Sequence, residues 1–290
     1  MDEWRGLAAG DLGRGIEAGR IDPVALAETF LEAAAAHPAG GRIYARLTRD
    51  RALAEAGAAR DRARAGLRRG PLDGVPLSWK DLFDSAGVAT EAGSRLLEGR
   101  VPAEDALVLK RATLGGAVCL GKTHMTELAF SGLGLNPMTA TPPNALDPAL
   151  APGGSSSGAA VSVALGLAAA AVGSDTGGSV RTPSAWNDLV GLKTTSGRLP
   201  LDGVVPLAAR FDTVGPLVRS VEDAALMLAL LEGGRPVDLR GARLAGTRLA
   251  VLETVALDDL RDTPAAAFDR AVARLEARGA RVTRIAVPAV

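Results

Sequence analysis

The sequence predicts an α/β protein with a mixed, mostly parallel sheet covered by helices on both faces, and a helical extension at the N-terminus. From residue 71 onward, short apolar runs typical of strands alternate with longer helical segments. Such alternation is typical of parallel strands joined by helices. The 290 residues are 47% hydrophobic, which is enough to bury a large core. We therefore divide the chain into a helical extension, residues 1–70, and an α/β core, residues 71–290.

The helical extension carries clear start and stop signals. Asp22 is a capping residue and Pro23 suits the first helical position, so together they predict a helix that runs to Ala36. Gly70 and Pro71 end the last helix of the segment. The expected elements are a weak, glycine-diluted helix at 4–18, a helix at 22–36, a short strand at 43–47 and a long helix at 49–68.

The core segment alternates strands with helices and contains no fixed-period repeat or low-complexity linker. The run V-P-L-S-W-K-D-L-F at 75–83 reads as a strand that ends in polar residues. The Ser-Val-Glu-Asp sequence from residue 220 is a helix cap. The other expected strands lie at 117–120, 168–172, 189–192, 248–252 and 281–285, and the expected helices at 105–113, 158–167, 220–231 and 264–278.

Composition excludes several classes of function. The 33 basic and 33 acidic residues cancel, and no basic block is interleaved with aromatic residues, so neither nucleic acid nor an anionic membrane is expected as a partner. The spacings typical of metal ligands are missing from the sequence. A single cysteine, Cys119, rules out an intramolecular disulfide, and the first residues lack the order of a signal peptide. We therefore expect a cytoplasmic protein.

Two motifs in the core segment are misleading. The stretch 116–123, G-A-V-C-L-G-K-T, matches the phosphate-binding pattern G-x-x-x-x-G-K-[ST], but its middle residues are apolar and strand-like rather than a loop. The stretch 154–158, G-S-S-S-G, matches the nucleophile elbow of α/β-hydrolases. That chemistry needs a histidine after the serine, whereas His37 and His124 both precede it. Neither nucleotide hydrolysis nor a Ser-His-Asp triad is therefore expected.

Serine paired with lysine remains as the candidate chemistry. A serine hydroxyl needs a base to attack an amide, and without histidine the candidate is a lysine that burial makes neutral. Lys80 ends an apolar strand-like run, where burial would lower its pKa. From the residues alone, Lys80 could equally be a solvated charge on the surface. The residues also leave open which serine of the two Gly/Ser clusters, at 153–158 and 173–179, is the nucleophile.

Several sequence blocks resemble the amidase signature family in their order and spacing, over residues 71–233. They are G-V-P-L-S-W-K-D, A-P-G-G-S-S-S-G-A-A, G-S-D-T-G-G-S-V-R-T-P, G-L-K-T-T-S-G-R and F-D-T-V-G-P-L-V-R-S-V-E-D-A-A. The resemblance implies that Ser179 is the nucleophile, that Ser155 follows a cis peptide bond and relays the proton, and that Lys80 is the base.

The resemblance also implies the groups around this triad. The backbone N–H groups of Thr176, Gly177, Gly178 and Ser179 would form the oxyanion hole. Independently of the resemblance, the two tandem glycines let successive N–H groups converge on one point. Asp175 and Arg181 match positions that brace the loop in the family. Ser156 is left open as either a supporting hydrogen-bond donor or a plain loop hydroxyl.

The function implied by the resemblance is hydrolysis of a linear carboxamide through an acyl-enzyme, without a cofactor. The expected partner is a small-molecule amide, and a homodimer is the candidate oligomer. The block after Lys193 lacks the tyrosine-containing form common in glutamine-hydrolysing subunits of tRNA amidotransferases, which favours a stand-alone amidase. Two alternatives stay open: the A subunit of such an amidotransferase, and an inactive, C-terminally truncated pseudo-amidase, because family members usually continue well beyond Val290. Ser157 and Ala159 also depart from the family form of the first Gly/Ser loop.

Overall fold

A six-stranded mixed sheet holds together the first of two units into which the chain divides. The computed structural model describes residues 2–286. The first unit ends at Val237 and the second begins at Asp238. The sheet order is β1-β3-β2-β4-β6-β5, in which β2, β3, β4 and β5 run in one direction and β1 and β6 run in the other. This confirms the predicted mixed, mostly parallel sheet. The strands are Tyr44–Leu47 (β1), Pro76–Lys80 (β2), Val118–Thr123 (β3), Ala170–Asp175 (β4), Val190–Gly191 (β5) and Thr213–Val218 (β6).

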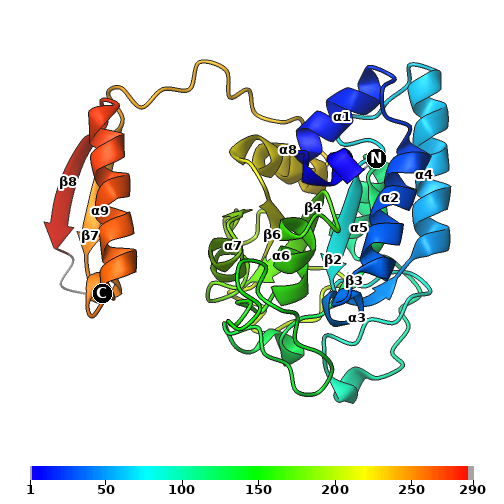
Figure 1. Cartoon of the computed structure of the whole chain (residues 1–290), viewed down its shortest axis with the longest axis horizontal. Helices are drawn as coiled ribbons and strands as arrows, with labels where there is room; N and C mark the ends of the chain where they lie inside the picture. The colour runs from blue at the N-terminus through cyan, green and yellow to red at the C-terminus, as the bar shows by residue number, and fades with distance from the viewer. Residues whose placement is uncertain (1, 287–290) are drawn as a thin grey trace. The chain divides into compact units, whose positions relative to one another are not determined.

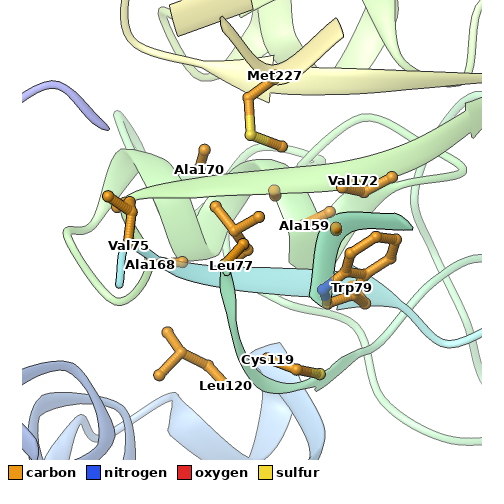
Figure 2. Close-up of a cluster of buried hydrophobic side chains, with 14 of the residues drawn as sticks. Val75, Leu77, Trp79, Cys119, Leu120, Ala159, Ala168, Ala170, Val172 and Met227 are labelled. Atoms are coloured by element: carbon orange, nitrogen blue, oxygen red, sulfur yellow. The ribbon is translucent and has the colours of Figure 1, made fainter. Parts of the chain in front are cut away.

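Helices lie on both sides of this sheet, as predicted (Figure 1). Successive residues of β2 point to opposite faces. Ser78 lies 2.8 Å, Oγ to Oγ, from Ser162 of α6. Its neighbour Leu77 belongs to the buried cluster that also contains Met227 of α8 and Ala170 of β4 (Figure 2). The helices of the first unit are Ala9–Glu17 (α1), Pro23–Ala36 (α2), Gly40–Ile43 (α3), Arg49–Arg64 (α4), Leu107–Leu114 (α5), Ser157–Ala164 (α6), Arg181–Trp186 (α7) and Val221–Glu232 (α8), with short 3-10 turns at Asp2–Gly6, Arg95–Leu97 and Glu127–Ala129.

The predicted helical extension shares the core of the sheet. Strand β1 pairs antiparallel with β3, and helices α2 and α4 pack on each other and on β3. Leu26 and Phe30 of α2 are fully buried in the main hydrophobic cluster. As expected from the sequence, the Asp22 side chain caps α2 by accepting from the N–H groups of Val24 and Ala25. The boundary at residue 70 stays a prediction drawn from composition.

Strand β6 was not expected from the sequence. It contains Gly215 and Pro216, and a proline normally argues against a strand because it cannot donate to the ladder. In the structure, the Pro216 carbonyl instead accepts from the N–H of Leu192 at 3.1 Å. A Cβ at Gly215 would lie 2.1 Å from the Leu192 carbonyl oxygen. Gly215 and Pro216, which argued against a strand in the sequence, therefore allow Leu192 to approach β6 closely.

The second unit is a β-α-β arrangement in which β7, Arg248–Glu253, pairs in parallel with β8, Arg281–Ala286. Helix α9, Asp262–Ala277, connects the two strands and follows a short turn at Val255–Leu257. The strands and helix predicted for this region are therefore confirmed. Within residues 2–286, no helix combines the length and apolarity needed to cross a membrane.

Candidate active site

Lys80 is the last residue of β2, and its side chain is fully buried. Its ammonium nitrogen donates to Ser155 Oγ at 2.7 Å and to Ser174 Oγ at 2.8 Å. Burial lowers the pKa of Lys80 to about 7, although the negative charges of Asp175 and Asp212 act to raise it. A substantial fraction of this amine is therefore neutral near pH 7. The reading of Lys80 as a solvated surface charge is wrong.

Ser155 lies in a loop that backbone hydrogen bonds fix in place directly before α6. The Gly154–Ser155 peptide bond is cis, as the family resemblance implied. The N–H of Gly154 donates to the Gly132 carbonyl at 2.8 Å, and the Ser155 carbonyl accepts from the N–H of Thr126 at 3.1 Å. A Cβ at Gly154 would lie 2.6 Å from the backbone nitrogen of Gly134, so only glycine fits here. The sequence therefore builds a tightly packed support for the Ser155 hydroxyl.

Ser179 lies in the loop between β4 and α7, which the buried carboxylate of Asp175 organises. Asp175 accepts from the N–H groups of Gly178 at 2.9 Å and Val180 at 3.1 Å, and from two guanidinium nitrogens of Arg181, each at 3.0 Å. Burial acts to raise the pKa of Asp175, but the hydrogen bonds from Arg181 and Val180 outweigh it and the pKa is lowered. The contacts expected of Asp175 and Arg181 are therefore present.

Ser156 joins the two loops. Its N–H donates to the Ser179 carbonyl at 3.3 Å, and its hydroxyl donates to the Ser174 carbonyl at 3.3 Å. Of the two alternatives left open for this residue, the structure therefore favours the supporting donor. Ser179 keeps 8% of its surface exposed, whereas Ser155 and Lys80 keep none. Of these three residues, only Ser179 is therefore in contact with solvent.

The backbone donors predicted for an oxyanion hole fall into two groups. The N–H of Gly178 is already committed to Asp175. Within the part of the chain that the structure describes, neither the N–H of Gly177 nor that of Ser179 has a hydrogen-bond acceptor. The N–H of Thr176 likewise has no acceptor among the described residues, and the Thr176 hydroxyl donates to Asp212 at 2.5 Å. The amides of Thr176, Gly177 and Ser179 are therefore the uncommitted donors of this loop.

Sequence reasoning missed Ser174 and Asp212. Ser174 contacts Lys80 directly, and Asp212 contributes negative charge near Lys80 while it also accepts from the N–H groups of Leu207 and Ala208. Both residues lie inside sequence blocks that resemble the family, which was the available signal. Neither position relative to Lys80 follows from local pattern, because it depends on how β2, β4 and β6 align in the sheet.

The phosphate-loop motif is a structural strand, as expected. Gly121, Lys122 and Thr123 belong to β3 and are buried. The Lys122 ammonium lies 3.2 Å from a carboxylate oxygen of Asp81 and donates to the Thr90 hydroxyl at 2.9 Å. Within residues 2–286, no group of three or more His, Cys, Asp or Glu residues could hold a metal ion.

Comparison with known proteins gives consistent results. The Amidase family matches residues 25–290. The A subunit of the glutamyl-tRNA(Gln) amidotransferase of Anaeromyxobacter dehalogenans is 44% identical over 233 residues, which are 80% of this chain and 47% of that protein. The 2-amino-5-chloromuconic acid deaminase of Comamonas testosteroni is 43% identical over 77% of this chain and 49% of its own length. The chain thus spans about half the length of these curated relatives.

Solved structures show the same likeness. The native peptide amidase from Stenotrophomonas maltophilia superposes with a TM-score of 0.88 at 34% identity, covering 99% of this chain and 63% of that one. A structure described as an amidase superposes with a TM-score of 0.87 at 37% identity, covering 97% of this chain and 64% of that one. With the family match extending over most of the chain, this protein belongs to the amidase family.

Proposed function

We propose that the protein hydrolyses the carbon–nitrogen bond of a linear carboxamide, with Ser179 as nucleophile, Ser155 as proton relay and Lys80 as base. The observation that carries the proposal is the buried 2.7 Å contact between Lys80 Nζ and Ser155 Oγ. The pKa of Lys80 is about 7, and its described hydrogen-bond partners are hydroxyls rather than carboxylates. Lys80 can therefore act as a base at neutral pH. Family membership supports amide cleavage as the reaction.

The first half of the reaction forms an acyl-enzyme. Neutral Lys80 accepts the proton of Ser155 Oγ while Ser155 accepts that of Ser179 Oγ, and Ser179 attacks the carbonyl carbon. The amides of Gly177 and Ser179 donate to the oxygen as negative charge develops on it. The carbon–nitrogen bond then breaks, and the proton held by Lys80 returns through Ser155 to the departing nitrogen. Ammonia or an amine leaves.

The second half of the reaction regenerates Ser179. A water molecule gives a proton to the same relay and attacks the ester carbonyl. The bond between the acyl carbon and Ser179 Oγ breaks, Ser179 regains its proton and the carboxylic acid is released. The relay thus needs a lysine that exchanges a proton near the working pH, which the burial of Lys80 provides.

A panel of linear carboxamides tests the proposal through the release of ammonia. Turnover should fall by at least about a thousandfold in Ser179→Ala and in Lys80→Met, since each removes a group required for bond cleavage. Ser196→Ala removes an exposed hydroxyl and Lys122→Met removes another fully buried lysine, so both should keep turnover within a few-fold of wild type. Wild-type turnover in Ser179→Ala would refute the assignment.

A second candidate is the glutamine-hydrolysing A subunit of a tRNA-dependent amidotransferase. It is favoured by the names of several relatives, among them the Anaeromyxobacter protein. This function would require a partner protein, so glutamine hydrolysis should be weak in the isolated chain and should rise when the partner is added. Light scattering would establish whether the isolated chain is a monomer or a homodimer. Amide turnover by either form without a partner protein would favour the stand-alone amidase instead.

A further inference from the structure

A cavity of about 340 Å³ opens at the amino ends of β2 and β3. Its walls come from the segment 69–72 before β2, the end of α5 and the second half of α8. Lys80 lies at the opposite, carboxyl end of β2, whose five residues span about 16 Å. The cavity is therefore separate from the candidate active site, and its volume is in the range of small-molecule sites.

One wall of the cavity is apolar. It is lined by Leu72, which is almost fully buried, by Leu114 at the end of α5, which is exposed, and by Leu226 and Leu230 of α8. Gly115 contributes to the close approach of the two helices, since a Cβ there would lie 2.4 Å from Leu230 Cδ1. An apolar body of several carbon atoms could displace water from this wall with a gain in free energy.

Two guanidinium groups line the same cavity with most of their hydrogen bonds unmade. Arg69 makes one long side-chain hydrogen bond, to the Thr113 carbonyl at 3.4 Å, and Arg111 makes one to the Leu231 carbonyl at 3.5 Å. Each guanidinium carries five N–H donors. Among residues 2–286, neither guanidinium forms an ion pair with a carboxylate.

The carboxylate nearest to Arg69 in the sequence is paired with another arginine. Asp73, four residues from Arg69, is occupied by the Arg62 guanidinium, which donates to it from Nε at 3.0 Å. The hollow that adjoins the cavity at Gly70 and Pro71 has no excess of charge, since Arg14 and Arg68 line it together with Glu17 and Glu222. The positive charge of the cavity itself therefore comes from Arg69 and Arg111.

We propose that this cavity binds a small organic anion with an apolar body, such as a medium-chain carboxylate. The head group would accept hydrogen bonds from Arg69 and Arg111, and the chain would lie against Leu72, Leu114 and Leu230. Arg111 is half-buried and Arg69 is exposed, and guanidinium groups bind carboxylates and other oxyanions through charge-assisted hydrogen bonds. The inference is independent of the amide chemistry at Ser179.

Isothermal titration calorimetry of the full chain with octanoate tests this proposal. Octanoate should bind with a dissociation constant below about 1 mM, whereas 1-octanol and octylamine, which lack the negative head group, should bind at least about tenfold more weakly. Acetate, which lacks the apolar body, should also bind at least about tenfold more weakly. Equal affinity for octanoate and octanol would overturn the role of the arginines, and heat too small to fit at about 10 mM octanoate would overturn the site.

Two variants and a matched control locate the binding. The double substitution Arg69→Gln with Arg111→Gln should weaken octanoate binding by about tenfold or more. Leu114→Trp fills the cavity from an exposed position and should weaken it similarly while both arginines remain. Removal of two exposed arginines elsewhere, in Arg20→Gln with Arg95→Gln, should leave affinity unchanged.

Folding of each variant is checked by circular dichroism and by its unfolding midpoint. Should the double arginine variant fail to fold, the Leu114→Trp variant and the octanol comparison still decide the proposal. Unchanged octanoate affinity in well-folded Leu114→Trp protein would refute it. In hydrogen exchange, octanoate should protect amides at 69–72, 111–115 and 226–234, and protection confined to other regions would contradict the placement.

Discussion

Replacing Lys80 by methionine should change how the stability of the first unit depends on pH. The side chain is fully buried, and burial lowers its pKa from 10.5 to about 7. Between pH 7 and pH 10 the unfolded chain therefore binds a proton at Lys80 that the folded protein does not. The free energy of unfolding of the wild type consequently rises with pH in this window, by up to about 1.4 kcal/mol per pH unit. Methionine removes this dependence.

The size of the effect follows from the two pKa values. From pH 7 to pH 9, the contribution of Lys80 to the free energy of unfolding should become more favourable by about 2 kcal/mol, and from pH 5 to pH 7 it should change by less than about 0.5 kcal/mol. Groups that titrate in both proteins cancel in the difference. The free energy of unfolding of the wild type, measured relative to Lys80→Met, should therefore rise by about 2 kcal/mol between pH 7 and pH 9.

Urea unfolding followed by tryptophan fluorescence measures this difference. All three tryptophans, Trp4, Trp79 and Trp186, lie in the first unit, so the signal reports on the unit that contains Lys80. Lys110→Met, on an exposed position of α5, controls for the loss of a lysine. A difference between Lys80→Met and wild type that stays constant from pH 7 to pH 9 would show that Lys80 remains charged, and would refute its role as a base at neutral pH.

Three further predictions concern the groups around the site. Ser174→Ala removes an acceptor that stabilises the charged form of Lys80. The midpoint of the pH profile of Ser179 labelling by a fluorophosphonate should therefore fall by about one pH unit. Ser85→Ala is the control: Ser85 is a buried serine without a hydrogen-bond partner among the described residues, and its replacement should leave the midpoint unchanged. Asp175→Ala should slow labelling by at least about tenfold because the Ser179 loop loses its buried acceptor, and an unchanged labelling rate would contradict this. Arg219 donates to five carbonyls, three at and after the end of α6 and two near the N-terminus. Arg219→Met should therefore destabilise the first unit to urea by about 2–4 kcal/mol, and a loss below about 0.5 kcal/mol would contradict this role.

Much of the fold could be predicted because its signals are local. The capping pair at Asp22 and Pro23 and the strand that leads to Lys80 each act through neighbouring residues. The same holds for the β-α-β pattern of the second unit. The predicted helix end was placed too late, since α4 ends at Arg64 rather than at residue 68. In contrast, β6 was hidden by Pro216, whose effect depends on which strand lies beside it. The division at Val237 falls in the Gly- and Pro-containing stretch 233–246, but the contacts that separate the two units are revealed only by the folded chain.

The candidate site was predictable where residue type and spacing carry the chemistry. Lys80, Ser155 and the loop that ends at Ser179 follow from sequence blocks that resemble the family. The second acceptor of Lys80, Ser174, lies 94 residues further along the chain and is brought close by the parallel pairing of β2 with β4. The use of the Gly178 amide by Asp175 likewise depends on how the loop folds back. Pairings of this kind require the three-dimensional register.

The most direct test of the central claim is to locate the residue that a fluorophosphonate modifies in the full chain, by peptide mass spectrometry. The proposed site predicts a single adduct on Ser179, formed faster as the pH rises through about 7 because Lys80 then becomes neutral. Lys80→Met should lose this pH-dependent rise, and Ser179→Ala should form no adduct. An adduct on Ser155 or Ser156, or a protein that stays unmodified while it remains folded, would contradict the account.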